Sequence, residues 1–438
     1  MRKIVSVNTA DLGGGAERIA TSLDSGYRQR GMESWLVVGD KRTDDPHVLA
    51  FHGSPFIDYR PYANPVRRFA LTARRERVRA KGWFDWQHPY SHRLGDMTVT
   101  PPDVVHLHNL HGGYFDLRAV AAMSQRWPTF VSLHDYWWFT GHCAYPLGCD
   151  RWRHGCGACG LLHVPPEAKA RDATRRNWQS KAAILRQCRL HVVSATQQMI
   201  DVARASILSP AIVEARVIPY GIDLSVFRPA PQAEARRRLG IPIDAFVLMY
   251  AGKNVRSNPF KHYQAIRHVL ERMNLTRPVW LLAVGEGGGD EVDGQRVVRH
   301  VPFIDSPLRM AMHYQAADVY VHAAHNEVFG IVLAEALACG IPVVATAVDG
   351  IPEVFRDGQH GFLVPRGDPS AMARAVQRLG EDDAMRHSFG GAAAEYARRR
   401  YDLQVMIDRH LEWYQEVHAG RPSGHGEMPS PHHDLGPV

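Results

Sequence analysis

The chain has no long hydrophobic run free of charges, and this lack predicts that no helix spans a membrane. The best candidate, residues 329–348, contains Glu335, Gly340 and Pro342, whereas a spanning helix needs about 20 predominantly apolar residues. The apolar core of a signal peptide is also lacking, because residues 1–7 have the pattern of a first strand. We therefore expect a cytoplasmic protein.

Two further absences narrow the class of protein. No segment repeats at the spacing of a solenoid, and no nucleic-acid recognition motif accompanies the net charge of +7. The positive charge allows an anionic partner such as a nucleotide or a phospholipid, and we expect no nucleic acid. A chain of 438 residues is too long for one core, so we expect two or three domains.

Strand-like and helical stretches alternate along the chain, which favours parallel sheets covered by helices. Five strands are predicted in each half: 4–8, 34–38, 104–107, 129–133 and 191–194, then 246–252, 280–284, 297–301, 319–322 and 342–346. Sheets of this kind carry ligand loops at the carboxyl ends of their strands, and here the two sheets would face each other across a cleft. The predicted fold class is therefore α/β with two Rossmann-like domains.

The domain boundaries follow from the same alternation. We place a first domain at residues 1–215 and a second at 225–392, with a hinge at 216–223 that ends in turn residues. A polar, amphipathic helix is predicted over residues 393–418. Residues 419–438 are rich in Pro, Gly, Ser and His, and we predict that they form a disordered tail.

Glu327 and Glu335 are the most informative residues, because they lie in a mostly apolar stretch where isolated carboxylates are costly to bury. A helix is predicted to open at Phe329-Gly330 and to end before Gly340. Glu327 then precedes the helix and Glu335 lies inside it. The free amides and dipole at the helix start suit a diphosphate, and the carboxylates suit sugar hydroxyls. The pattern fits a sugar nucleotide as ligand.

A glycine-rich turn, Gly13-Gly14-Gly15, follows the first strand and opens a helix, so its backbone can approach a phosphate closely. Arg18 stands where the third glycine of a dinucleotide-binding fingerprint belongs. Asp40 after the second strand resembles the ribose-binding acid of that fold. An NAD-dependent oxidoreductase is therefore an alternative, but it leaves Glu327 and Glu335 unexplained. Turn chemistry alone is the other interpretation of the glycines.

Polar residues at two strand ends are candidates for a site. His134 follows the strand at 129–133 and precedes Asp135, a position at which ligand loops of open α/β sheets lie. In the second half, Arg256 and Lys261 lie on a loop after the strand at 246–252. Their charges would offset those of a diphosphate, and a solvated basic loop is the alternative.

Four of the six cysteines, Cys143, Cys149, Cys156 and Cys159, fall within 17 residues. Disulfides are unusual in the cytosol, so the cluster predicts a structural zinc site. The spacing is not that of a standard zinc finger, and free thiols near an aromatic loop are the alternative.

A basic cluster between residues 67 and 81 is interleaved with apolar and aromatic residues, which suits an anionic membrane surface. A solvated helix face is the alternative. The cationic members are Arg67, Arg68, Arg74, Arg75, Arg77, Arg79 and Lys81, and Trp83, Phe84 and Trp86 follow them.

These motifs together resemble the retaining GT-B glycosyltransferases of family 4, over most of residues 1–400. The strongest part is Glu327-x7-Glu335 with the segment 336–344 after it, extended by residues 349–354 and 357–364. Residues 217–223 are similar to the family's hinge, with Tyr220 where Asn is usual. Residues 106–114 and the Trp/Cys loop at 135–159 look like the branch that builds bacterial exopolysaccharide, colanic-acid-type and capsule chains.

The resemblance implies a role for each matching residue. Glu335 holds the nucleotide ribose, Glu327 contacts the donor sugar, and His134 hydrogen-bonds the sugar near the reacting centre. The remaining implied donor contacts are the amides of Phe329, Gly330 and Ile331, the cations Arg256 and Lys261, and the closing turn at Gly14 and Gly15. His262 departs from the family, which usually has glycine there. The final helix is expected to cross back onto the first domain.

The implied reaction transfers a sugar from a nucleoside-diphosphate donor to an acceptor hydroxyl, with retention of configuration. No Asp-x-Asp pair lies at a strand end where it could hold a catalytic metal, so we expect a reaction that requires no cofactor. The exopolysaccharide-type resemblance implies a growing saccharide acceptor on a polyprenyl diphosphate, and hence a protein peripheral on the inner face of the cytoplasmic membrane. A non-catalytic sugar-nucleotide-binding subunit is the alternative.

Overall fold

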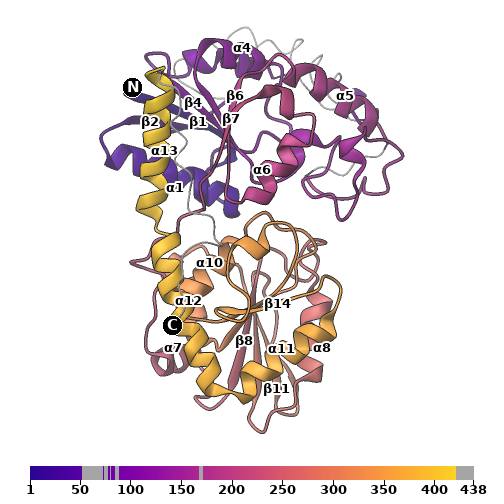
Figure 1. Cartoon of the computed structure of the whole chain (residues 1–438), viewed down its shortest axis with the longest axis vertical. Helices are drawn as coiled ribbons and strands as arrows, with labels where there is room; N and C mark the ends of the chain where they lie inside the picture. Colours follow the sequence, from indigo (N-terminus) through magenta and orange to yellow (C-terminus); the bar gives the residue numbers. More distant parts are fainter. Residues whose placement is uncertain (52–72, 74–76, 79, 84–87, 167–170, 421–438) are drawn as a thin grey trace, which may run out of the picture.

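A computed structural model of the chain shows two α/β lobes stacked along the long axis of the molecule (Figure 1). It describes residues 1–438 except 52–72, 74–76, 79, 84–87, 167–170 and 421–438. Most of the basic cluster at 67–81 and nearly all of the predicted tail at 419–438 therefore lie outside the described residues. Within the described parts of the chain, no helix is both long and apolar enough to cross a bilayer.

The first lobe contains a seven-stranded parallel sheet in the order β3-β2-β1-β4-β5-β6-β7. Its strands are β1 (Lys3–Ala10), β2 (Glu33–Asp40), β3 (Val48–Ala50), β4 (Val104–Leu107), β5 (Thr129–Ser132), β6 (Leu190–Ser194) and β7 (Ile212–Val217). The order turns around at β1 and β4, so the loops after these two central strands diverge and open a crevice at the sheet's carboxyl edge.

The second lobe contains another seven-stranded sheet in the order β10-β11-β9-β8-β12-β13-β14, in which only β10 and β11 pair antiparallel. Its strands are β8 (Phe246–Ala251), β9 (Val279–Val284), β10 (Glu291–Asp293), β11 (Arg296–Val301), β12 (Val319–His322), β13 (Val343–Thr346) and β14 (Gly361–Val364). The predicted strands and the α/β class with two Rossmann-like domains are confirmed.

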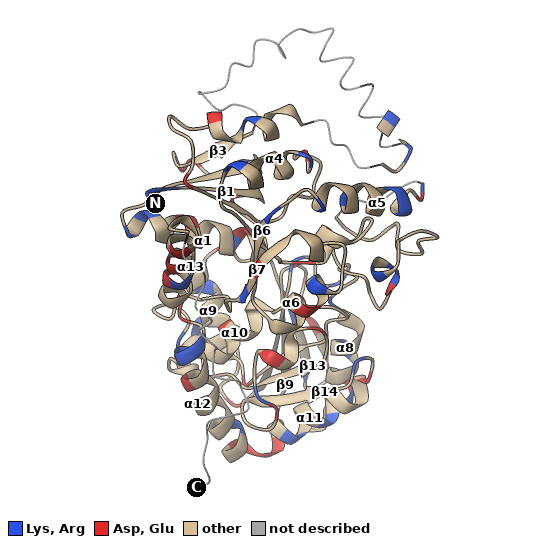
Figure 2. Ribbon diagram, turned by 45° about the horizontal axis from the view of Figure 1, so that its top comes forward, with Lys and Arg blue, Asp and Glu red and all other residues tan. Residues whose placement is uncertain are grey.

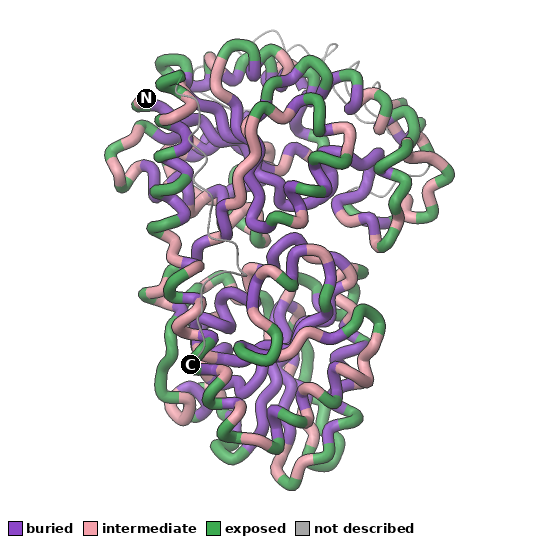
Figure 3. The backbone as a smooth tube through the Cα atoms, viewed as in Figure 1, coloured by how far each residue is buried: buried purple, intermediate pink, exposed green. Residues whose placement is uncertain are grey.

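Helices cover the sheets, so the central strands are buried on both faces. Every residue of β8 and β9 is buried, as their unbroken apolar sequences predict, and Figure 3 shows buried strands through the middle of each lobe. The longer helices of the described chain are α1 (Gly15–Gln29), α4 (Ala119–Arg126), α5 (Thr174–Leu185), α6 (Gln197–Arg204), α7 (Gln232–Leu239), α8 (Tyr263–Arg272), α9 (Pro307–Ala316), α10 (Ile331–Ala338), α11 (Pro369–Glu381), α12 (Asp383–Arg400) and α13 (Leu403–His418).

Where one helix was expected over residues 393–418, the structure has two. Helix α12 packs against α10 in the second lobe and ends at Arg400. Helix α13 begins at Leu403 after Asp402, whose carboxylate caps it by accepting the Gln404 N–H at 2.7 Å. The backbone of Asp402 also pairs with Ile222 of the hinge. The break lets the chain turn between the lobes.

Helix α13 crosses back and packs on the first lobe, where it runs beside α1 (Figure 1). The approach is close, because a Cβ on Gly26 of α1 would lie 2.3 Å from Ile407 Cδ1. Trp413 is fully buried, meets Phe130 of β5 edge to face at 4.9 Å, and donates its indole N–H to Glu214 at 3.0 Å. The last helix therefore completes the core of the first lobe.

We predict that Trp413→Ala lowers the free energy of unfolding of the first lobe by about 3–5 kcal/mol, because it leaves a large cavity under α13. Urea denaturation followed by far-UV circular dichroism measures this. Val405→Ala on the same helix is the matched control, because Val405 is 41% exposed, and it should change stability by less than about 0.5 kcal/mol. Equal effects of the two substitutions would contradict the docking of α13.

Candidate active site

A cavity of about 300 Å³ lies between the two lobes, with walls from both. The first lobe contributes the turn after β1 and the first residues of α1, and the second lobe contributes the loops after β8, β9 and β12 and the start of α10. The sequence-predicted residues that line it are Gly14, Gly15, Lys261, Glu327, Gly330 and Ile331. The structure thus brings together the glycine-rich turn, a basic loop and the helix that follows Glu327.

Helix α10 carries one charged residue, Glu335, in an otherwise apolar sequence. Gly330 precedes the helix with φ +73, a left-handed conformation that glycine adopts without strain. The Leu333 N–H donates to the Gly330 carbonyl at 2.8 Å. The amides before it lie at the cavity, because Gly330, Ile331 and Val332 line it. Positive potential from these amides is therefore available to an anion in the cavity.

Glu335 is completely buried, and both of its carboxylate oxygens have partners. One oxygen pairs with the guanidinium of Arg18, which comes from α1 of the other lobe. The other accepts the hydroxyl of Tyr314 on α9 at 2.9 Å. Arg18 also lines the cavity, with 40% of its side chain exposed. Arg18 therefore lies between the cavity and Glu335, which is not among the lining residues, and an ion pair joins the two lobes at this point.

Glu327 lies in the loop before α10, with a carboxylate 2.7 Å from Lys261 Nζ and 3.6 Å from His322 Nε2. Burial opposes ionisation, but Lys261 and His322 outweigh it and lower the pKa of Glu327 to about 2. The N–H of Glu327 is fixed by Asp349, which accepts it at 2.9 Å. Glu327 is therefore ionised near pH 7, and its contacts fix its position at the cavity wall.

Asp349 joins several parts of the site, although no role was predicted for it. Besides the Glu327 N–H, its carboxylate accepts the Asn326 side-chain amide at 2.9 Å and the Tyr136 hydroxyl of the first lobe at 3.3 Å. Burial raises the pKa of Asp349, and Asn326, the Glu327 N–H and Tyr136 oppose this shift. The signal was present in the sequence, because Asp349 begins one of the motifs that carry the family resemblance.

The two predicted cations of the second lobe differ in position. Lys261 lines the cavity, whereas Arg256 pairs with Glu286 at 2.9 Å and donates to the Gly287 carbonyl at 3.0 Å. Arg256 is not among the cavity-lining residues. His262, next to Lys261, has φ +43, the left-handed region that favours glycine. This conformation accounts for the glycine that the resembled family usually has there.

His134 is buried beside the hinge, and both of its ring nitrogens have partners. Nδ1 lies 2.6 Å from the Tyr220 hydroxyl and Nε2 lies 2.9 Å from His108 Nδ1. Burial lowers the pKa of His134 to about 4, although Asp135 opposes the shift. His134 is therefore neutral near pH 7, and it does not line the cavity. A sugar can hydrogen-bond a ring nitrogen of His134 only by replacing one of these partners.

His134 belongs to a cluster of buried histidines that reaches α13. His106 contacts Ser132 at 2.9 Å and the Tyr414 hydroxyl of α13 at 2.6 Å, and the rings of His106 and His108 are 4.1 Å apart. The ring of His410, also on α13, is 5.7 Å from that of His106. Burial lowers the pKa of His106 and His108, and lowers that of His410 to about 4.

Phe329 is buried rather than lining the cavity. Its ring meets Tyr220 of the hinge edge to face at 5.1 Å and Tyr401 at 5.4 Å. The predicted contact of its amide with a ligand concerns the backbone only. Sequence reasoning missed Arg18 and Tyr314 as partners of Glu335, because nothing local marks a contact between residues so far apart in the chain.

Comparisons with known proteins agree with this geometry. The family model "Glycosyl transferases group 1" matches residues 231–396. D-inositol 3-phosphate glycosyltransferase from Thermobispora bispora is 30% identical over 328 residues, covering 67% of this chain and 73% of that protein. The protein of the same name from Thermomonospora curvata is 35% identical over 222 residues, covering 45% of this chain and 50% of that protein.

Two solved structures share the fold. Sucrose-phosphate synthase from Thermosynechococcus elongatus has a TM-score of 0.68 at 21% identity, covering 96% of this chain and all of that one. HepE from Anabaena in complex with UDP-glucose has a TM-score of 0.63 at 18% identity, covering 95% of this chain and all of that one. In both cases the similarity is in the two-lobed fold.

We predict that the protein loses stability as pH falls from about 6.5 toward 4, because of the buried histidines. Their pKa values are lowered in the folded state, so in this window the unfolded chain binds protons that the folded chain does not. Stability therefore rises with pH, by up to about 1.4 kcal/mol per pH unit for each histidine. Chemical denaturation at a series of pH values measures the slope.

Substitution of one histidine tests the origin of this slope. His410→Gln keeps a polar side chain and removes one titrating site, so the slope should decrease by up to about 1.4 kcal/mol per pH unit. His387→Gln, at an exposed position on α12, is the matched control and should keep the wild-type slope. Identical slopes for all three proteins would show that the cluster does not cause the pH dependence.

Proposed function

The chain belongs to the group 1 glycosyltransferases, and we propose that it transfers a sugar from a nucleoside-diphosphate donor to a saccharide hydroxyl with retention of configuration. The observation that supports this most is the cavity between the lobes, in which Glu327 and the start of α10 lie beside Lys261 and the Gly14-Gly15 turn. Carboxylates suit sugar hydroxyls, and helix amides with a cation suit a diphosphate.

We assign residues to the ribose, the sugar and the diphosphate of the donor. Glu335 accepts the ribose hydroxyls after Arg18 has moved aside, and Glu327 accepts hydroxyls of the transferred sugar. The amides of Phe329, Gly330 and Ile331 face the diphosphate, and Gly14 and Gly15 close over it. Lys261 is held near this position by Glu327 at 2.7 Å, whereas Arg256 reaches a phosphate only by leaving Glu286.

In this proposal the site accelerates the reaction by stabilising the charges that develop during sugar transfer. Negative charge develops on the leaving diphosphate, and positive charge develops on the sugar ring. Lys261 and the α10 amides are fixed before the donor arrives, and preorganised charge of this kind is usually the largest contribution to catalysis. His134, neutral because its pKa is about 4, serves as a hydrogen-bond partner of the sugar after the sugar has replaced Tyr220 or His108. No metal or organic cofactor takes part.

The proposal also concerns the identity of the acceptor, for which there are two candidates. The loops at residues 106–114 and 135–159 resemble the exopolysaccharide branch of family 4, which favours a saccharide on a polyprenyl diphosphate. D-inositol 3-phosphate is the second candidate acceptor, because proteins named for that substrate are about 30% identical to this chain. Incubation with each acceptor and mass spectrometry of the product separates the two. A protein that binds the donor but neither transfers nor hydrolyses it would be a non-catalytic subunit.

We predict that Glu335→Gln weakens binding of the preferred nucleotide, because a charged acceptor of two ribose hydroxyls becomes a neutral amide. The expected loss is about 1.5–3 kcal/mol, or roughly 10- to 150-fold in Kd. A thermal-shift screen with UDP, GDP and ADP selects the base, and calorimetry with that nucleotide measures the variant.

Glu234→Gln is the matched control for this substitution. Glu234 lies exposed on α7, outside the cavity lining, and pairs with the surface residues Arg237 and Arg238, so donor affinity should be unchanged. Wild-type affinity in folded Glu335→Gln would remove Glu335 from the donor site.

We also propose that the protein works at an anionic membrane surface, where a polyprenyl-linked acceptor is found. The support is the sequence of the basic cluster at 67–81 and a shallow basic pocket beside its described end. That pocket contains Lys81, Arg171, Arg175 and Arg176, the last two on the first turn of α5. Figure 2 shows Lys and Arg on this part of the first lobe. Trp83 is stacked by Lys81 at 4.6 Å and by Arg176 at 4.0 Å.

We predict that anionic vesicles sediment the wild-type protein, that neutral vesicles do not, and that binding weakens as salt rises. Changing Arg67, Arg68, Arg74 and Arg75 together to Ser should abolish sedimentation, because each cation near the surface contributes about 1 kcal/mol. The control carries the same charge change in the second lobe, at the exposed residues Arg237, Arg238, Arg398 and Arg399. Equal sedimentation of the two variants would reject the membrane role.

A further inference from the structure

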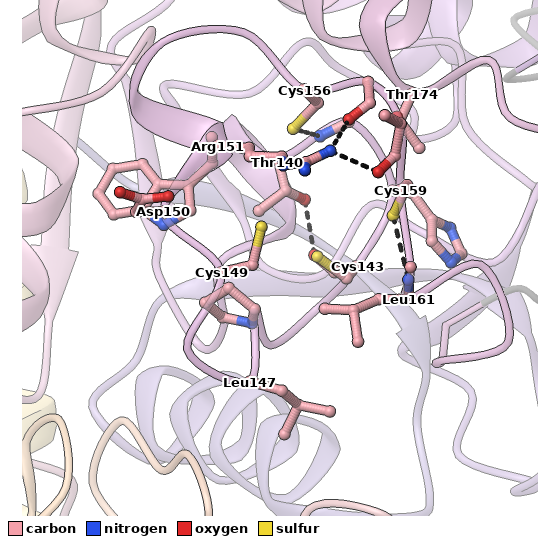
Figure 4. A pocket seen from close by; sticks show the side chains of 17 residues that line it. Thr140, Cys143, Leu147, Cys149, Asp150, Arg151, Cys156, Cys159, Leu161 and Thr174 are labelled. Atoms are coloured by element: carbon pink, nitrogen blue, oxygen red, sulfur yellow. Dashed lines mark hydrogen bonds between the residues drawn. The ribbon is translucent and has the colours of Figure 1, made fainter.

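We propose that Cys143, Cys149, Cys156 and Cys159 bind one structural zinc ion. All four side chains line one cavity of about 440 Å³ in the first lobe, separate from the cavity between the lobes. Figure 4 shows their sulfur atoms around the same open space. The only other cysteines of the chain, Cys188 and Cys339, lie outside this cavity.

The ligand set fits zinc by its chemistry. Four thiolates are a common structural ligand set for zinc, and two of them here come from a C-x2-C segment, Cys156 to Cys159. The other two, Cys143 and Cys149, lie on the preceding part of the same loop. All four cysteines are free of disulfides. As free thiols around one cavity, the four sulfurs can share a single tetrahedral metal ion.

Two backbone amides already point at the sulfurs. Gly141 N–H donates to Cys156 Sγ at 3.2 Å, and Leu161 N–H donates to Cys159 Sγ at 3.4 Å (Figure 4). Hydrogen bonds of this kind stabilise a thiolate and orient a metal ligand. The loop therefore supplies part of the outer shell that thiolate ligands require.

Zinc binding requires the sulfurs to move inward from their positions in the structure. Among the described residues, no three His, Cys, Asp or Glu side chains are placed to hold a metal, whereas a tetrahedral site needs four sulfurs about 2.3 Å from the ion. The cavity gives the side chains room to rotate toward its centre. We infer that the metal draws the two parts of the loop together.

The loop that the zinc would hold reaches the cleft between the lobes. Tyr136 N–H donates to the Ala144 carbonyl at 2.8 Å, and the Tyr136 hydroxyl contacts Asp349 at 3.3 Å. The ring of Tyr145 meets Phe260 of the second lobe edge to face at 5.0 Å. A metal at the cysteines would therefore fix two aromatic side chains that border the site.

Metal analysis of the intact protein tests the proposal. Wild type is purified without chelator and without a metal-affinity step, and elemental analysis should find one zinc per chain. Cys156→Ser and, separately, Cys149→Ser should lose it. Cys188→Ser is the matched control, because Cys188 is a buried cysteine between α5 and β6 that donates its S–H to the Ile184 carbonyl at 3.4 Å. This control should keep the zinc.

Thiol titration in denaturant without reductant separates zinc from disulfides. Zinc-bound protein should release the metal and show all six thiols of the sequence, whereas a disulfide would remove thiols in pairs. Metal-free wild type, missing thiols, iron in place of zinc, or equal zinc in Cys156→Ser would each overturn the proposal. Wild type is measured directly, so the zinc proposal can be overturned even if a variant fails to fold. Donor binding is measured separately, so the zinc proposal and the proposed glycosyltransferase function can fail independently.

Discussion

A carboxylate with no exposed surface, Glu335, sets the constraint on which the site depends. Burial of an ionised carboxylate is strongly unfavourable unless a cation or several hydrogen bonds accompany it. Here Tyr314 comes from α9 of the same lobe and Arg18 from α1 of the other. In the structure the one charge of the apolar helix α10 has a cationic partner because the lobes lie close together. The site and the arrangement of the lobes therefore depend on each other.

Helix α13, the last helix, connects to the buried histidines of the first lobe. Tyr414 of α13 hydrogen-bonds His106 of β4, and through ring contacts the buried histidines continue to His134 beside the hinge. Burial keeps these imidazoles neutral near pH 7, and the cations that line the cleft are Arg18, Lys253 and Lys261. A segment from the end of the chain thereby helps to fix the protonation state of a residue near the candidate site.

The sequence predicted the parts of this protein that depend on local pattern. Unbroken apolar runs predicted the central strands, and the position of Glu327 before a helix that contains Glu335 was correct because helix start signals are local. What could not be predicted depends on tertiary contacts. The Arg18–Glu335 pair joins residues 317 positions apart, and Arg256 points to Glu286, which lies on a different loop. The two partners of His134 likewise come from separate segments.

If a ligand binds Glu335 as proposed, it exchanges places with Arg18, which pairs with this carboxylate in the structure. A ribose that takes the carboxylate must first separate an existing ion pair, so its apparent affinity is reduced by the free energy of that pair. The same event removes a tether between the lobes. Occupancy of the carboxylate and opening of the cleft are then linked equilibria, and whatever shifts one shifts the other by the same amount. Under the proposed assignment, a single arginine couples occupancy of the carboxylate to how far apart the lobes stand.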